Sequence, residues 1–235
     1  MLQIFDTGTD TAAANMRFDE KLLGELQPGS DPILHLYHWT HSSATFGYFI
    51  LPEKHLDLEK AKNWGLDLAR RPTGGGIVFH IWDLAFSFLM PSNHPHFSVN
   101  TLENYQFVNK AVLEVVRSYF GLSPELIEQN APTLGPDCQN FCMAKPTQYD
   151  VVYQGMKIAG AAQRRRHQGY LHQGTISLSS PHAGLLEDVL LSKQDVLQAM
   201  NAFTFAPIQD NLQIGRVRQD LQKLLADKLK ESLSF

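Results

Sequence analysis

The spacing of apolar residues along the chain predicts three helices, and a capping-box pattern predicts one more. The first follows the cap candidates Thr9 and Asp10 and carries Asp19 on its polar face. The second spans 101–120 and stops at a glycine, while the third, near 193–203, opens with a capping-box pattern. The fourth closes the chain. The apolar positions expected on their buried faces are Met16, Leu22, Leu23, Leu26, Tyr105, Val108, Val112, Val115, Tyr119, Ile214, Val217, Leu221, Leu224 and Leu225.

Short apolar runs between glycine, proline and polar clusters predict the strands of a sheet. The stretch 149–163 is predicted to form two strands joined by a tight turn at Gln154 and Gly155. The other predicted strands are 33–39, 44–51, 66–71, 76–81 and 171–178. Helices and strands do not alternate strictly, so the pattern favours the α+β class, or an α/β class with a mixed sheet.

The composition narrows the class of protein further. The chain has 235 residues, of which 43% are hydrophobic and 19% charged, which suits one folded domain spanning 1–235 without a separate accessory domain. A net charge of -4 argues against nucleic acid as the main partner. The richest apolar run, 84–90, is too short to cross a membrane, and the N-terminus lacks a signal-peptide pattern. We therefore expect a cytoplasmic protein that does not contact the membrane.

The most distinctive local motif is RRPTGGGIVFH, from Arg70 to His80. Consecutive glycines let a ligand approach bare backbone, and an adjacent guanidinium supplies a permanent positive charge. This combination suits a phosphate group, although the motif is neither a Walker loop nor a dinucleotide fingerprint. A purely structural glycine-rich turn is an equally good explanation from these residues alone.

Lys157, in the sequence GMKIAGAAQRRR, is a second candidate. In a regular strand Lys157, Ala159 and Ala161 would share one face, so the ammonium would stand above small side chains that leave room for a ligand. Such a lysine could stabilise charge that develops on a phosphate or an acyl group. The commoner alternative is a lysine on the solvated face of an edge strand.

The remaining reactive side chains carry weaker signals. Cys142 could act as a nucleophile if a nearby donor stabilised its thiolate, whereas most isolated cysteines, Cys138 included, are buried packing residues. His80 and His172 adjoin glycine-rich segments. The basic run 164–167 is usually solvated but could attract an acidic protein partner. No histidine pattern supports a metal site.

Taken in order, these motifs resemble the lipoate-protein ligase and octanoyltransferase branch of the biotin/lipoate ligase superfamily. The resemblance runs through AANMRFDEKLL, LHLYHW, TFGYF, RRPTGGGIVFH, YDVVYQGMKIAGAAQRR and LHQGTISL, which together reach from about residue 12 to 180. It implies a mixed sheet flanked by helices, with a narrow tunnel for a medium-length acyl chain. Biotin is a less suitable substrate, because the lysine strand and its GAAQ continuation look like the lipoate branch.

The resemblance also implies roles for individual residues. Lys157 would contact the activated acyl group, and Cys142 would be the second catalytic candidate. The residues implied to bind the acyl-adenylate or ATP are Arg70, Arg71, Gly74, Gly75, Gly76, Ile77, Val78, Phe79 and His80, and those implied to line the acyl pocket are Ala159, Gly160, Ala161, His172 and Gly174.

Two reactions remain open within this family, and the ligase is narrowly favoured. A ligase would use ATP and Mg²⁺ to join lipoate or octanoate to a lysine of a lipoyl carrier domain, in the acyltransferase subunit of a 2-oxoacid dehydrogenase complex or in the glycine-cleavage H protein. A cysteine-dependent octanoyltransferase would need no cofactor and would take octanoate from acyl carrier protein through a Cys142 thioester. The complete triple glycine looks ligase-like, whereas the missing aspartate directly after His80 does not. A non-catalytic protein that binds lipoate or a carrier domain is the alternative from another class.

Overall fold

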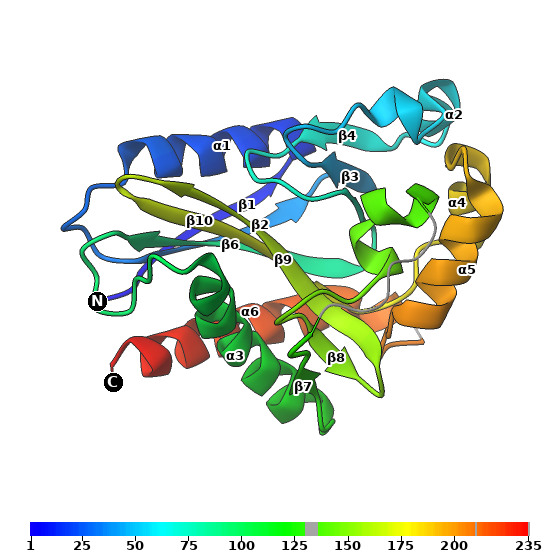
Figure 1. The fold of residues 1–235 in the computed structure, drawn as a ribbon. Coiled ribbons are helices and arrows are strands. Elements are labelled where there is room, and N and C mark those ends of the chain that lie inside the picture. Colours follow the sequence, from blue (N-terminus) through cyan, green and yellow to red (C-terminus); the bar gives the residue numbers. More distant parts are fainter. Residues whose placement is uncertain (130–135, 210, 235) are drawn as a thin grey trace.

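The computed structural model describes residues 1–129, 136–209 and 211–234. Its largest element is a mixed seven-stranded sheet in the order β1-β2-β6-β10-β9-β8-β7 (Figure 1). β1 and β2 run parallel, and the other neighbouring pairs are antiparallel. The strands are β1 (Gln3–Asp10), β2 (Ile33–Trp39), β6 (Asp83–Pro91), β7 (Glu125–Leu126), β8 (Val151–Tyr153), β9 (Met156–Arg166) and β10 (Gly169–Ser177).

A second sheet has three short strands in the order β4-β3-β5. β3 (Ser43–Phe46) pairs in parallel with β4 (Asp67–Arg70) and in antiparallel fashion with β5 (Ile77–His80). The chain passes from β4 to β5 through the glycine-rich segment 71–76. This segment therefore lies at one end of the small sheet, where its backbone is not committed to a ladder.

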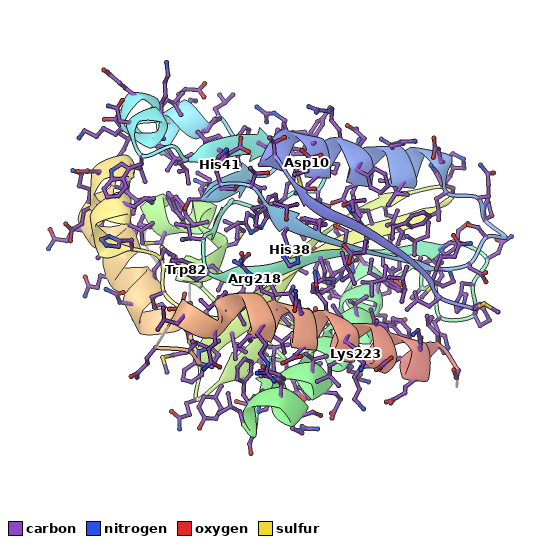
Figure 2. The ribbon with its side chains drawn as sticks, turned by 180° about the vertical axis from the view of Figure 1, so that it is seen from behind. Asp10, His38, His41, Trp82, Arg218 and Lys223 are labelled. Atoms are coloured by element: carbon purple, nitrogen blue, oxygen red, sulfur yellow. The ribbon has the colours of Figure 1, made fainter. Side chains whose placement is uncertain are left out.

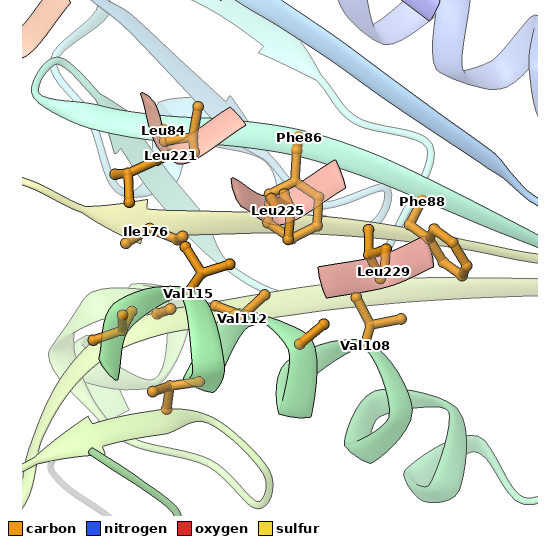
Figure 3. Packing of buried hydrophobic residues seen from close by; sticks show 14 of the residues in the cluster. Leu84, Phe86, Phe88, Val108, Val112, Val115, Ile176, Leu221, Leu225 and Leu229 are labelled. Atoms are coloured by element: carbon orange, nitrogen blue, oxygen red, sulfur yellow. The ribbon is translucent and has the colours of Figure 1, made fainter. Parts of the chain in front are cut away.

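Side chains of the large sheet alternate between its two faces, as the two-residue period of a strand requires. On one face, leucines and phenylalanines of β2 and β6 pack against α3 (Thr101–Phe120) and α6 (Ile214–Leu233) to form the main core (Figure 3). α1 (Ala12–Glu25) covers the opposite face (Figure 1). Each such buried side chain contributes roughly 1.5–3 kcal/mol.

The small sheet has its own core, which includes residues of α2 (Leu58–Asn63), α4 (Ala183–Val189) and α5 (Lys193–Phe203). Both cores belong to the described part of the chain, and in that part no helix has the length and apolar content needed to cross a membrane. Residues of both sheets line the cavity that holds the candidate site.

The predicted α+β class is confirmed, as are the helices 101–120 and 193–203 and the turn at Gln154 and Gly155, where both residues have positive φ. Gly121 ends the long helix in the left-handed conformation. The strand expected over 44–51 ends instead at Phe46. The pattern did not predict β1, β6, α2 or α4.

The start of the first helix differs from the expectation in two respects. Its cap is Thr11, whose hydroxyl accepts a hydrogen bond from Ala14 N at 3.2 Å, in place of Thr9 or Asp10. Asp19 does not lie on a solvated face. Its carboxylate is fully buried and is satisfied by hydrogen bonds from distant segments that helical periodicity cannot reveal.

Candidate active site

A cavity of about 430 Å³ lies where the α1-facing side of the large sheet meets the small sheet. The α1 side contributes Met16, Tyr37 and Ala85, while the small sheet contributes Thr45 and Val78. The glycine-rich segment and the segment around Cys142 complete the wall. Most predicted site residues line this cavity: Arg71, Gly74, Gly75, Gly76, Val78, His80, Cys142, Lys157, Gly160, Ala161 and Gly174.

The Cys142 thiol is placed by donors from the glycine-rich segment. Gly76 N–H donates to Cys142 Sγ at 3.2 Å, and Arg71 Nη2 lies 3.7 Å from the same sulfur. The Arg71 guanidinium is buried and is held by the carbonyls of Gly74, at 3.0 and 2.7 Å, and of Thr45, at 3.2 Å. Both donors would stabilise negative charge on the sulfur.

The glycines of this segment are needed for packing around the thiol. Gly75 has a φ of +82°, and a Cβ there would come within 2.8 Å of Arg71 Nη2 and 3.5 Å of Cys142 Sγ. A Cβ on Gly76 would overlap the backbone of Asn140. The expectation that Gly76 is small to admit a ligand is therefore incomplete. Its missing side chain lets the segment that carries Cys142 dock.

Lys157 projects into the cavity from β9 and is only 3% exposed. Its Nζ forms an ion pair with Asp150 Oδ2 at 2.7 Å and donates to Cys142 O at 3.0 Å. Thr147 also donates to that carboxylate, through its backbone N–H at 2.7 Å and its hydroxyl at 2.8 Å. A Cβ on Gly160 would overlap the end of the lysine side chain. The alternative of a solvated surface lysine is therefore excluded.

A hydrogen-bonded histidine lies across the cavity. His80 Nε2 is 2.9 Å from the hydroxyl of Thr45, and His80 Nδ1 is 2.6 Å from Asp83 Oδ2, to which Thr175 donates at 2.5 Å. Burial disfavours the charged form of Asp83, but the interaction with His80 outweighs this and holds the pKa of the carboxyl below its usual value. His80 therefore has its carboxylate partner three residues further along the chain.

The backbone of Asp83 is fixed from the far side of the sheet. Arg218 rises from α6 toward the strands (Figure 2) and donates to Asp83 O at 2.6 Å and Ile81 O at 3.1 Å. Burial lowers the pKa of Arg218, and the negative charge of Asp83 partly offsets this lowering. The last helix therefore braces the strand end that holds His80.

Part of the cavity wall consists of residues to which the sequence patterns assign no site role. Met16, Tyr37, Trp39 and Ala85 line it, and the Trp39 ring stacks on His80 with centroids 4.5 Å apart. The available signal was the alternation of ILHLYHW, in which Tyr37 and Trp39 share a face. Nothing local to those residues shows that this face borders a cavity.

Five predicted site residues lie outside the cavity lining. Ile77 and Phe79 point into the core of the small sheet, because alternate residues of β5 face opposite ways. Ala159 packs beside Ile158 in the main core, since a register shift at Ile158, between Lys157 and Ala159, breaks the regular alternation of β9. Lys157 and Ala161 face the cavity but Ala159 does not, so the prediction that all three share one face is wrong.

Arg70 and His172 are the other two. The Arg70 guanidinium turns outward and donates to the carbonyls of Tyr48 and Ile50 at 2.5 and 2.9 Å. His172 lies behind the cavity wall, fully buried, with Nδ1 2.8 Å from Gln163 Nε2. Burial lowers the pKa of His172 to about 3, so its imidazole is neutral at physiological pH.

Within residues 1–129, 136–209 and 211–234, no group of three or more His, Cys, Asp or Glu side chains is arranged to hold a metal ion. The titratable groups that line the cavity include the Cys142 thiol, the ammonium groups of Lys145 and Lys157, the Arg71 guanidinium and the His80 imidazole. A nucleophile beside fixed cationic donors is suited to acyl transfer.

Comparison with known proteins defines the class. Residues 11–203 match the lipoyl protein ligase A/B catalytic domain. The chain therefore belongs to this family of enzymes. Two solved structures show the same fold: protein Ta0514 of T. acidophilum with bound lipoic acid (TM-score 0.74, 23% identity, all of this chain and 86% of that chain covered), and a lipoate-protein ligase A bound with ATP (TM-score 0.74, 24% identity, 99% and 85% covered).

Curated relatives narrow the comparison further. The chain is 34% identical over 196 residues to octanoyltransferase LipM of Anoxybacillus flavithermus, covering 81% of this chain and 68% of the relative. It is 33% identical over 177 residues to octanoyltransferase LipM of Staphylococcus aureus, covering 73% and 63%. The chain thus spans about two thirds of the length of these relatives.

Proposed function

We propose that this protein is a cysteine-dependent octanoyltransferase that moves octanoate from a carrier thioester to a lysine of a lipoyl carrier domain. The main support is the position of Cys142, which lines the cavity and whose Sγ accepts a hydrogen bond from Gly76 N–H at 3.2 Å. The relatives named octanoyltransferase support the same reaction. This reverses the preference for an ATP-dependent ligase that the triple glycine suggested.

In the first half-reaction the Cys142 thiolate attacks the carbonyl carbon of the octanoyl thioester. The carbonyl π electrons move onto oxygen, and the tetrahedral intermediate then collapses, breaking the bond to the donor's sulfur. The donor leaves as a thiolate that takes a proton, and the octanoyl group remains on Cys142. Gly76 N–H and Arg71 stabilise the attacking sulfur, both within 3.7 Å of it.

In the second half-reaction the neutral amine of the acceptor lysine attacks the Cys142 thioester. The C–N bond forms, the C–S bond breaks, the proton of the amine passes to solvent, and Cys142 returns as thiolate. Lys157 lines the same cavity, and its Nζ donates to the backbone carbonyl of Cys142 at 3.0 Å. We assign to this ammonium the stabilisation of the oxyanion in either tetrahedral intermediate. The acyl chain extends toward Met16, Tyr37 and Trp39.

The experiment incubates purified protein with octanoyl thioester while the acceptor is withheld. One octanoyl mass should appear on the intact protein, should be released by hydroxylamine, and should be absent in Cys142→Ser. Cys138→Ser is the matched control, because Cys138 is buried in the small-sheet core and does not line the cavity.

The competing reaction predicts a different result. A ligase would exchange pyrophosphate with ATP in the presence of free octanoate or lipoate, and Cys142→Ser would keep its ATP-dependent activity. That outcome, or an unlabelled Cys142 in active protein, would overturn the proposal.

A further inference from the structure

An exposed aromatic ridge stands beside the candidate site. Phe49 is 87% exposed, and Tyr48 and Leu51 are each 45% exposed. The rings of Tyr48 and Phe49 meet edge to face with centroids 5.2 Å apart. Large apolar side chains gathered on one surface segment are typical of protein interaction sites. We call residues 48–51 the Phe49 ridge.

The Phe49 ridge is fastened to the segment that holds the thiol. Gly47 N donates to Gly76 O at 3.2 Å, and Tyr48 N donates to Thr73 O at 2.9 Å. A Cβ on Gly47 would overlap the backbone of Gly75, so the two backbones are in direct contact. Gly75 is exposed and also lines the cavity. The ridge therefore borders the mouth that opens over Cys142.

Arginines surround the ridge. Arg70 donates to the carbonyls of Tyr48 and Ile50, which explains why its guanidinium faces away from the cavity. Arg164 lies over the Tyr48 ring, 5.0 Å from the centroid, and donates to Pro72 O at 3.1 Å. Arg164 and Arg166 are each 3.7 Å from a carboxylate oxygen of Glu20, the one acidic ion-pair partner recorded for these arginines in the described chain.

This local charge opposes that of the whole chain. The net charge is -4, yet Arg70 and Arg164 contact the ridge, and Arg166 shares the Glu20 partner of Arg164. A fixed apolar tip bordered by guanidinium groups complements a partner whose surface is acidic around an apolar patch.

Taking the transferase reaction as given, we propose that the Phe49 ridge and its flanking arginines dock the acidic face of the lipoyl carrier domain that accepts the acyl group. The length of the arm that enters the cavity distinguishes the lipoyl domain, which accepts the acyl group, from the carrier that donates it. A lysine ammonium sits on a four-carbon stem, so the acceptor's backbone must come directly against the mouth beside Cys142. A donor that presents its acyl thioester on a long prosthetic arm does not need such contact.

The test compares Phe49→Ser and Arg164→Glu with the wild-type protein. For both variants we expect the KM for an apo lipoyl domain, and its Kd measured by calorimetry, to rise by about tenfold or more, with kcat changed less. Affinity of the wild-type protein should fall as salt is raised, and Arg164→Glu should flatten this dependence. Leu212→Ser and Lys223→Glu serve as exposed apolar and charged controls, with Lys223 on α6 (Figure 2).

The outcomes separate this inference from the proposed reaction. If wild-type protein forms no Cys142 thioester, the reaction fails, but the Kd comparison still decides the docking surface. Unchanged Kd and KM for the lipoyl domain in both variants would overturn the inference. So would a rise confined to an acyl carrier protein donor, because the surface would then serve the donor.

Discussion

Cys142 and Lys157 reach the same cavity from different kinds of backbone. Cys142 begins a single 3₁₀ turn, Cys142–Ala144, in a segment outside both sheets. Lys157 belongs to β9, which is paired with β8 on one side and β10 on the other. The thiol is placed by hydrogen bonds from a distant glycine-rich segment, whereas the lysine is placed by its own strand and a neighbouring carboxylate.

This difference separates two ways of building a reactive group. We call the part of the cavity formed by β9 with Lys157 the strand wall, and the part formed by Cys142 and the glycine-rich segment 71–76 the loop wall. The strand wall is held by backbone ladders and a buried ion pair, so damage to it should lower stability as well as activity. The loop wall depends on close packing against glycine, so small side chains added there should move the thiol. The predictions below test the contrast from the largest expected effect to the smallest.

The strand wall predicts that Lys157→Met loses both activity and stability. Transfer should fall by roughly 10²–10³, because oxyanion stabilisation is lost. The free energy of unfolding should fall by about 3–5 kcal/mol, because Asp150 is left buried without its cation. Activity assays and chemical denaturation measure the two effects.

A double variant, Lys157→Met with Asp150→Asn, separates them. It should regain most of the lost stability, since no uncompensated charge remains, but none of the lost activity. If the single variant is as stable as wild type, Lys157 is not part of a buried ion pair and the described strand wall is wrong.

The loop wall predicts a smaller and more local effect for Gly76→Ala. The new methyl group would press on the Asn140 backbone and displace Cys142, slowing Cys142 acylation by roughly tenfold and costing about 1–3 kcal/mol of stability. Gly74→Ala is the matched control for stability, because a Cβ there meets nothing within 4 Å. Its free energy of unfolding should stay within about 0.5 kcal/mol of wild type. Equal destabilisation by both changes would contradict the packing role of Gly76.

The smallest effect concerns acid sensitivity behind the strand wall. The pKa of His172 is about 3 in the folded protein, against 6.5 for an ordinary histidine. Between these two pKa values the unfolded chain binds a proton at His172 and the native state does not. The neutral His172 therefore contributes fully to stability above pH 6.5, and this contribution declines as pH falls toward 3. Between pH 7 and 5 the expected loss is about 2 kcal/mol.

His172→Phe should make the dependence of unfolding free energy on pH shallower over this range. Denaturation at several pH values gives the slope, which does not depend on the absolute stability of the variant. The pKa values of His38 and His94 are also lowered by burial and are unchanged by the substitution, so the difference in slope isolates His172. An unchanged slope would show that the pKa of His172 is the same in the folded and unfolded protein, so that burial does not lower it.

The same contrast explains how far the sequence could predict the site. Apolar periodicity predicted α3 and α6, and the glycine turn at 154–155 predicted the hairpin that carries Lys157. The capping-box pattern predicted α5, although Ser192 makes no side-chain cap bond there. The predicted alternation is wrong at Ala159, because pairing with β8 sets a register shift between Lys157 and Ala159. Local patterns describe single strands, and partners fix their irregularities.

Contacts between distant segments were beyond the sequence patterns. Two contacts of the site are local in sequence: the ion pair of Lys157 with Asp150 and the hydrogen bond of His80 with Asp83. The sequence patterns still did not predict them, because the patterns do not show that these side chains are buried together. The docking of Cys142 on Gly76 spans a sequence separation of 66 residues. The motif resemblance selected His80, Lys157, Cys142 and Gly76 but neither carboxylate partner, and the geometry of all these contacts depends on tertiary packing.

The pairing of β6 with β10 has a consequence for synthesis. Asp83 pairs with Ser177, which is 94 residues later in the chain, and β6 is buried along its whole length. At about 5–20 residues per second, a ribosome needs roughly 5–20 s to supply that partner. During this interval one edge of an apolar strand lacks its native neighbour, and the segment carrying Cys142 and Lys157 is still unanchored. Nascent-chain chaperones are therefore most useful to this protein between the emergence of β6 and that of β10.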